Sequence, residues 1–163
     1  MATANTNLST YDIEKIPTGA DFRIGIVVSE WNDKITLNLL KGAKETLLKH
    51  LVKEENIFIH FTPGSFELPL GAQFLLEHSK VDGVIALGSV IQGETKHFDF
   101  VCNGVSQGIK DVSLKYNKPV IFGVLTDDTM QQAIDRSGGR HGNKGIESAV
   151  ACLKMIAFKN ELK

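Results

Sequence analysis

Short apolar runs rich in β-branched residues alternate with longer stretches of helical periodicity, and this alternation constrains the fold more than any other feature of the chain. Runs of this kind bounded by turn residues indicate buried strands. They predict strands at residues 22–29, 57–62, 81–87 and 119–125. The intervening stretches predict helices. Asn32 or Asp33 can cap the first, Asp127 or Asp128 opens a short one that stops near 138–139, and the others span about 67–79, 97–115 and 143–159.

This order of elements predicts an α/β fold. We expect a three-layer α/β/α sandwich with a four-stranded parallel sheet of the flavodoxin-like kind, covered by helices on both faces. A chain of 163 residues suits one domain, which we place at 11–163. Residues 1–10 are polar and predict a mobile N-terminal tail. Residues 11–16 are a candidate extra strand that would pair with a neighbouring subunit.

Composition excludes several classes of partner. The net charge is −1, so no basic excess points to nucleic acid or to an anionic membrane surface. No apolar run approaches the ~20 residues of a membrane span, and the N-terminus lacks the pattern of a secretory signal. Cys102 and Cys152 are isolated, which predicts buried free thiols in a reducing compartment. We therefore expect a cytoplasmic protein.

Unusual residues follow every predicted strand. Ligands of parallel α/β sheets bind beyond the carboxyl ends of the strands. Four informative segments at one edge of the sheet therefore predict a pocket. They are EWN (30–32), PGSFELP (63–69), SVIQGETKHF (89–98) and FGVLTDDT (122–129).

The first two segments offer groups for a flat, polar ligand. Trp31, the single tryptophan, either covers the sheet edge as core or stacks on a flat ring. Ser65 and Glu67 either begin a helix or hold a polyol and ring N–H groups.

The third segment combines a candidate phosphate site with a histidine. Gly93, Glu94 and Thr95 precede a helix, where unpaired backbone N–H groups attract phosphate. No Walker loop and no dinucleotide-binding glycine fingerprint is present. His97 is either structural or a proton-transfer group beside that phosphate.

Two cations complete the candidate site. Arg136 ends a short predicted helix, where it either favours the helix dipole or clamps a phosphate through paired hydrogen bonds. Lys144 lies at a predicted helix start. It is either a plain solvated charge or, because the dipole does not favour a cation there, the partner of a ligand.

Taken together, these residues closely resemble the lumazine synthase family. The resemblance runs from about residue 22 to the C-terminus, and its specificity comes from the order and spacing of all the segments. They are SEWN (29–32), PGSFELP (63–69), GSVIQGETKHFDF (88–100), FGVLT (122–126), DRSGGRHGNKG (135–145) and Glu147.

The resemblance implies a reaction. The family condenses 5-amino-6-(D-ribitylamino)uracil with 3,4-dihydroxy-2-butanone 4-phosphate, without a metal or redox cofactor, to give 6,7-dimethyl-8-ribityllumazine for riboflavin biosynthesis. By matched position, His97 would be the general acid/base, and Glu94, Thr95 and Arg136 would bind phosphate. The ribitylaminouracil would be held by Trp31, Ser65, Phe66, Glu67, Ser89, Val90 and Ile91, with Phe122 and Lys144 of the adjoining subunit.

The resemblance also implies an assembly. Family members form pentamers with sites between adjacent subunits, and some build a 60-subunit icosahedral shell. The stretch GGRHGN (138–143) is similar to the connector of shell-forming members, which favours the shell here. Riboflavin synthase is a candidate partner. This chain departs from the family pattern at Trp31, Gln92 and Gly104, where Phe, Arg and Glu are common.

Three other functions fit parts of the pattern. A binding or container protein would keep the pocket or shell without turnover, yet both His97 and Arg136 are present. A riboflavin synthase of the archaeal type has no phosphorylated substrate, which conflicts with the phosphate segment. A flavodoxin-like electron carrier fits the fold alone.

Overall fold

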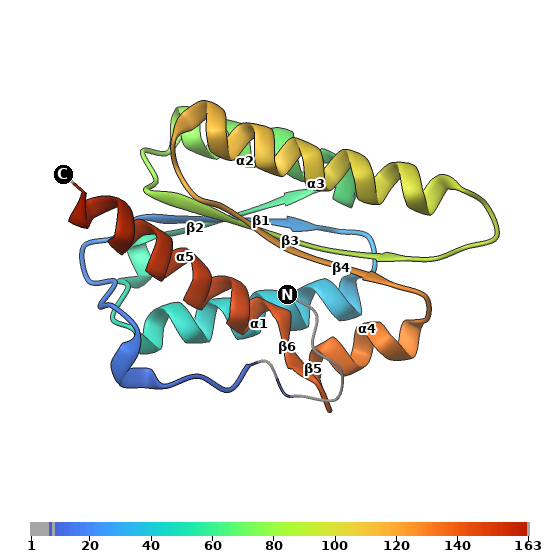
Figure 1. Ribbon diagram of the computed structural model, residues 1–163, viewed down its shortest axis with the longest axis horizontal. Helices are drawn as coiled ribbons and strands as arrows, with labels where there is room; N and C mark the ends of the chain where they lie inside the picture. The colour runs from blue at the N-terminus through green and yellow to red at the C-terminus, as the bar shows by residue number, and fades with distance from the viewer. Residues whose placement is uncertain (1–6, 8, 163) are drawn as a thin grey trace.

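The centre of the protein is a parallel sheet of four strands in the order β2-β1-β3-β4 (Figure 1). The computed structural model describes residue 7 and residues 9–162. Every neighbouring pair of strands in this sheet is parallel, which confirms the predicted fold class. The strands are β1 (Ile24–Ser29), β2 (Ile57–Thr62), β3 (Gly83–Ile91) and β4 (Val120–Asp127).

Helices cover both faces of the sheet and complete the three layers (Figure 1). One face carries α2 (Leu68–His78) and α3 (His97–Tyr116), and the other carries α1 (Asp33–Lys49), α4 (Met130–Arg136) and α5 (Lys144–Glu161). The short elements are η1 (Ile13–Lys15), η2 (Glu54–Asn56), η3 (Ser65–Glu67), β5 (Ser137–Gly139) and β6 (Gly142–Asn143).

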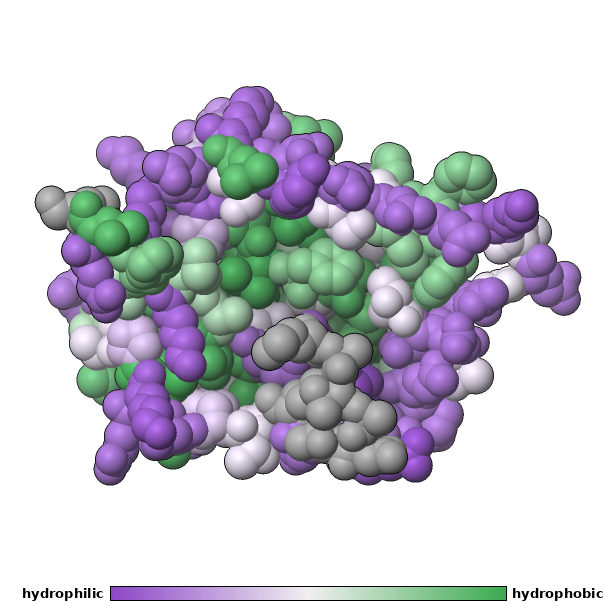
Figure 2. All heavy atoms as spheres, in the orientation of Figure 1, coloured by the Kyte–Doolittle hydropathy of each residue, from purple (hydrophilic) through white to green (hydrophobic). Residues whose placement is uncertain are grey.

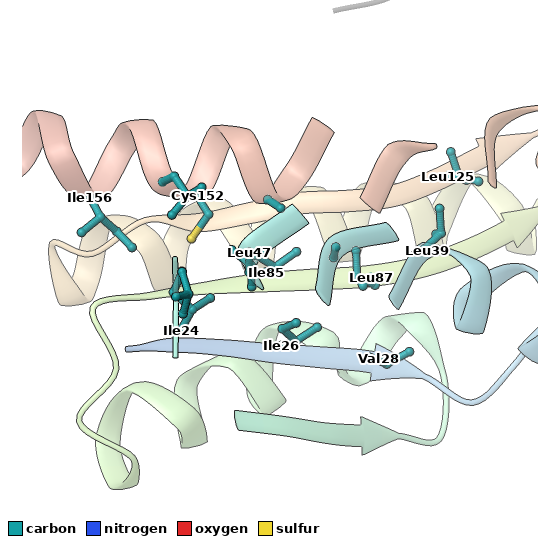
Figure 3. Packing of buried hydrophobic residues seen from close by; sticks show 14 of the residues in the cluster. Ile24, Ile26, Val28, Leu39, Leu47, Ile85, Leu87, Leu125, Cys152 and Ile156 are labelled. Atoms are coloured by element: carbon teal, nitrogen blue, oxygen red, sulfur yellow. The ribbon is translucent and has the colours of Figure 1, made fainter. Parts of the chain in front are cut away.

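Alternate residues of the central strands fill two separate cores, because successive side chains of a strand point to opposite faces. Ile24, Ile26 and Val28 of β1 lie in the core below α1 and α5 (Figure 3). Val27 lies in the other core, with α2 and α3. Burial of each aliphatic side chain contributes roughly 1.5–3 kcal/mol, so both cores hold the central strands firmly in place. Hydrophilic residues gather on the outer faces of the helices (Figure 2).

Strands β3 and β4 extend further than the sequence predicted. Gly88 to Ile91 continue β3, and their partners in β4 run to Asp127. The two extensions pair with each other, and the apolar run of each strand alone does not predict them. Ser89, Val90 and Ile91 are therefore strand residues rather than loop residues.

Helix α4 begins at Met130, two or three residues later than the predicted start at Asp127 or Asp128, and Thr129 caps it. The Thr129 hydroxyl accepts a hydrogen bond from the backbone N–H of Gln132 at 3.3 Å. The Gln132 side chain accepts one from the Thr129 N–H at 3.2 Å. This reciprocal pair is a capping box.

The N-terminal segment packs on its own chain in place of the extra strand expected at residues 11–16. Ile13–Lys15 form a 3₁₀ turn, and the Tyr11 hydroxyl lies 3.1 Å from His50 Nε2. Burial and the Lys49 charge lower the pKa of His50. The Ser9 hydroxyl donates to the Asn143 carbonyl oxygen at 3.2 Å. Of the predicted mobile tail, residues 1–6 and 8 lie outside the described residues.

Both cysteines are free thiols. Cys152 is buried, and burial with the Asp82 charge raises its pKa to about 12. Cys102 is half-buried, and burial with Asp99 raises its pKa as well. A raised pKa disfavours the thiolate, which is the reactive form. Across residues 7 and 9–162, no helix has the length and apolar character to cross a membrane.

Candidate functional site

A cavity of about 590 Å³ opens at the carboxyl edge of the sheet, beside the connection from β3 to α3 at the right of Figure 1. We call it the edge pocket. The segments that follow β1 and β2 build it together with the end of β3 and the first turn of α3. It is lined by Trp31, Asn32, Gly64, Ser65, Phe66, Glu67, Ser89, Val90, Ile91, His97, Phe100 and Val101. The structure thus brings together eight of the predicted site residues: Trp31, Ser65, Phe66, Glu67, Ser89, Val90, Ile91 and His97.

Three aromatic rings at the edge pocket are exposed. Trp31 is 72% exposed, Phe66 58% and Phe100 72%, so the alternative that Trp31 is core is wrong for this chain. Exposed rings around one cavity are suited to hold a flat ligand by stacking. Sequence reasoning missed Phe100. It lies three residues after His97 in α3, and helix periodicity puts such residues on one face.

Asn32 fixes the β1–α1 turn against the end of β3. Its backbone is left-handed, with φ 60°, and its side chain makes no cap bond to α1. Instead, Nδ2 donates to the Ser89 carbonyl oxygen at 2.9 Å. Asn tolerates this conformation better than most residues. The side chain that sequence reasoning assigned to helix capping therefore ties two walls of the edge pocket together.

The turn η3 places Ser65 and Glu67 at the edge pocket without using them as caps. Gly64 occupies the N-cap position of η3 and Glu67 that of α2, and neither makes a side-chain cap bond. Ser65 is buried and Glu67 is exposed. Because helix capping does not occupy these oxygens, the hydroxyl and the carboxylate stay available as acceptors for a ligand.

The connection from β3 to α3 is exposed from residue 92 to His97. His97 is the first residue of α3, and its backbone N–H donates to the Thr95 hydroxyl at 3.3 Å. His97 lines the edge pocket, whereas Glu94 and Thr95 do not. The proton-transfer candidate therefore lies at the cavity, and the predicted phosphate segment lies next to it in the chain.

The remaining predicted cations lie in a separate group, which we call the ion cluster: Arg136, Lys144 and Glu147. Arg136 Nη2 lies 3.1 Å from Glu147 Oε1, and Lys144 Nζ lies 3.2 Å from Glu147 Oε2. Arg136 Nη1 also donates to the His141 carbonyl oxygen at 3.1 Å. The three side chains are only 16–21% exposed. The sequence suggested a ligand as the partner of Lys144, whereas in the structure its partner is Glu147.

Strand β4 carries Asp127, which lies near Arg136, and the predicted site residue Phe122. Asp127 ends β4, and burial raises the pKa of its carboxyl; the Arg136 charge lowers it and Asp128 raises it. Phe122 is half-buried against the core under α2 and α3. Neither residue, and no member of the ion cluster, lines the edge pocket of the same chain.

The donor groups do not form a metal centre within the part of the chain that the structure describes. No group of three or more His, Cys, Asp or Glu side chains there is placed to hold a metal ion. The edge pocket instead offers rings, a hydroxyl, a carboxylate and an imidazole, which can bind and protonate an organic ligand.

Fold and pocket together define a class. The chain is a flavodoxin-like α/β protein with a pocket beyond the carboxyl ends of a parallel sheet, where proteins of this class bind their ligands.

Comparison with known proteins defines the family. The sequence model of 6,7-dimethyl-8-ribityllumazine synthase matches residues 21–160. Curated proteins of that name from Parabacteroides distasonis and Cytophaga hutchinsonii are 56% and 58% identical. The alignments cover 97% and 96% of this chain, and 99% and 98% of those proteins. One from Flavobacterium johnsoniae is 58% identical, over 99% of this chain and 85% of its own length. The chain belongs to the 6,7-dimethyl-8-ribityllumazine synthase family, as its sequence motifs predicted.

Proposed function

We propose that this chain condenses 5-amino-6-(D-ribitylamino)uracil with 3,4-dihydroxy-2-butanone 4-phosphate to give 6,7-dimethyl-8-ribityllumazine, the penultimate step of riboflavin biosynthesis. Family membership supports the reaction. The observation that carries it is the edge pocket, where exposed rings, the η3 turn and His97 surround one cavity of about 590 Å³. A pyrimidine with a polyol side chain needs this combination of an apolar face and polar ends.

The ribitylaminouracil would occupy the edge pocket. Trp31 stacks on the pyrimidine ring, and Phe66 provides a second apolar wall. Ser65, Glu67 and the backbone of Ser89 and its neighbours bind the ribityl hydroxyls and the ring edge. Ser89, Val90 and Ile91 are held in strand β3, so the backbone groups that meet the ligand are already ordered before binding, which lowers the entropy cost.

His97 would move protons while the bonds change. The aryl amine attacks the ketone carbonyl, and loss of water gives an imine. Elimination then releases phosphate, and ring closure with loss of a second water gives the product. The condensation and ring closure need protons delivered to or removed from oxygen and nitrogen, and the elimination needs a proton removed from the carbon next to the imine. A positioned imidazole can both deliver and remove protons near neutral pH. Correct placement of both substrates supplies much of the remaining acceleration.

The phosphate would bind between Glu94 and Thr95 on one side and Arg136 on the other. The exposed backbone at the start of α3 offers N–H donors. Arg136 offers a planar guanidinium that can bind two phosphate oxygens.

A second copy of the chain would complete the site. Arg136, Lys144 and Phe122 lie outside the edge pocket of their own chain, which supports sites formed between adjacent subunits. Edge strand β2 and helix α2 also expose Phe61, Leu70 and Phe74 beside an apolar groove. Such a patch suits an interface. We infer a homopentamer, further assembled into the 60-subunit shell that the GGRHGN stretch favours.

Compartment and partners follow from the same role. A single domain at 11–163 would work in the cytoplasm without nucleic acid, membrane or cofactor. Its product would be consumed by riboflavin synthase, which is a candidate physical partner of the shell.

The test is to mix purified protein with both substrates and to follow lumazine fluorescence and released phosphate together. Stoichiometric appearance of both supports the proposal. Absence of both from correctly assembled protein would contradict it. Turnover of added lumazine would indicate a riboflavin synthase, and tight binding of flavin mononucleotide would indicate an electron carrier.

A further inference from the structure

We propose that Gly104 is a positioning residue for the edge pocket: its missing side chain makes room for the Phe66 ring, and it thereby sets affinity for the ribitylaminouracil. Gly104 lies in α3, seven residues after His97, and it does not line the cavity itself. The inference rests on the proposed function, because it concerns the substrate of that reaction.

The Phe66 ring packs directly on the backbone of α3 at Gly104. A Cβ atom at this position would lie 2.6 Å from Phe66 Cε2, 3.2 Å from Cδ2 and 3.6 Å from Cζ. Carbon atoms in contact normally lie about 3.5–4.0 Å apart, so alanine at this position requires the ring to move.

Residues on both sides of Phe66 in the chain approach other glycines just as closely. A Cβ at Gly108, one helical turn further along α3, would lie 2.7 Å from Pro69 Cγ. A Cβ at Gly88 of β3 would lie 2.6 Å from Ser65 Oγ. Close approach from two elements therefore fixes the position of η3, and with it the wall of the edge pocket.

Glycine at this place opposes the stability of the helix. Gly104 lies in the interior of a helix that runs from His97 to Tyr116, where glycine is less favourable than alanine. The close approach of the Phe66 ring explains why a glycine stands at this position of the helix.

A side chain at position 104 would change the cavity rather than the fold. The atoms in its way belong to the end of a ring that is 58% exposed, so the ring can rotate without displacing the backbone. The displaced ring changes the wall that faces the pyrimidine. The phosphorylated substrate has no such ring, so its binding should not respond.

The decisive variant is Gly104→Ala. We expect KM for the ribitylaminouracil to rise about three- to tenfold, the size expected from the loss of one aromatic contact. KM for the phosphorylated substrate should stay unchanged, and the midpoint of thermal unfolding should stay equal or rise. Fluorescence of the single Trp31 at the cavity reports binding of ribitylaminouracil alone, without turnover.

Phe66→Leu provides the double-mutant test. In this background the ring is absent, so Gly104→Ala should have no further effect on binding. Gln107→Ala, at an exposed position of the same helix, is the matched control and should bind as the unmodified protein does.

Three outcomes would overturn the role of Gly104: unchanged binding in Gly104→Ala, the same loss in the Phe66→Leu background, or failure of Gly104→Ala to fold and assemble. Unmodified protein that binds the ribitylaminouracil but forms no lumazine would overturn the proposed function alone, and the binding comparison would still decide the role of Gly104. Unmodified protein that does neither would overturn both.

Discussion

The edge pocket and the ion cluster differ in how freely their side chains could meet a polar ligand. The edge pocket presents rings that are more than half exposed, Trp31, Phe66 and Phe100. The ion cluster holds its two cations against Glu147 with about four-fifths of each side chain covered. The first region is open for a ligand, whereas the second is already paired. A phosphate that binds Arg136 must therefore share the guanidinium with Glu147, which keeps it oriented.

The largest expected effect separates chemistry from binding in the edge pocket. In His97→Ala, kcat should fall about 10²-fold or more, because a positioned acid/base supplies about 10²–10⁴-fold. Both KM values should change little, and measurable turnover should remain from placement of the substrates. Steady-state kinetics on assembled protein measures this. His78→Ala, at the end of α2, is the control. Complete loss of turnover in assembled His97→Ala would contradict the division between chemistry and placement.

Arg136→Ala tests whether the ion cluster serves the phosphate. Loss of a hydrogen bond to a charged group typically costs about 1.5–3 kcal/mol, so KM for the phosphorylated substrate should rise about 10- to 100-fold. KM for the ribitylaminouracil should not change. Arg140→Ala is a matched control, because Arg140 Nε pairs with Asp135 at 2.8 Å and its side chain is 72% exposed. An unchanged KM for the phosphorylated substrate in Arg136→Ala would remove the clamp role.

Trp31→Ala tests the opposite selectivity to Arg136→Ala, because it should weaken binding of the ribitylaminouracil and not of the phosphorylated substrate. The loss of one stacking partner, about 0.5–1.5 kcal/mol, should raise KM for the ribitylaminouracil about two- to tenfold and leave the phosphorylated substrate unaffected. Trp31→Phe keeps a ring and should restore most of the affinity. If both variants changed KM for the phosphorylated substrate instead, the two regions would not divide the substrates between them.

Asp127→Asn should give the smallest effect, on stability rather than on turnover. Burial raises the pKa of this carboxyl in the folded protein, so its ionised form is less favoured there than in the unfolded chain. The stability it contributes is present below its unfolded pKa of about 3.9 and is lost as pH rises through the folded pKa. Asp127→Asn should therefore melt higher than the unmodified protein at pH 7, and the difference should disappear near pH 4. Equal melting at both pH values would contradict the raised pKa.

The sequence predicts most of the fold because its signals are local. The apolar run of each strand predicts that strand, and the alternation of strands with helices predicts the parallel sheet. The extensions of β3 and β4 escaped prediction because polar residues such as Ser89 and Asp127 are strand residues there only through the pairing of β3 with β4. Ser89 pairs with Leu125, and Asp127 pairs with Ile91. The 3₁₀ turn at Ile13–Lys15 escaped for a similar reason, since the segment packs on His50, far away in the chain.

The edge pocket was predictable to the extent that its residues follow strands. Trp31, Ser65 and His97 were found in this way. Asn32 was assigned to a helix cap. Its actual bond to the Ser89 carbonyl joins residues 57 positions apart, and the local sequence gives no sign of such a contact. The pairing of Lys144 with Glu147 was missed although their spacing of three residues in α5 is a known helical contact distance.

The bond between Ser9 and Asn143 has a consequence for how the chain acquires its structure. The two residues are 134 positions apart, so during synthesis the N-terminal segment leaves the ribosome long before its partner exists. Closing so long a loop early brings an entropy cost without any contact to offset it. The sheet and its first helices can form in the meantime, since domains fold as their sequence emerges. Docking of Ser9 is therefore a late event that waits for the start of α5 to be made, whereas the contact of Tyr11 with His50 can form earlier.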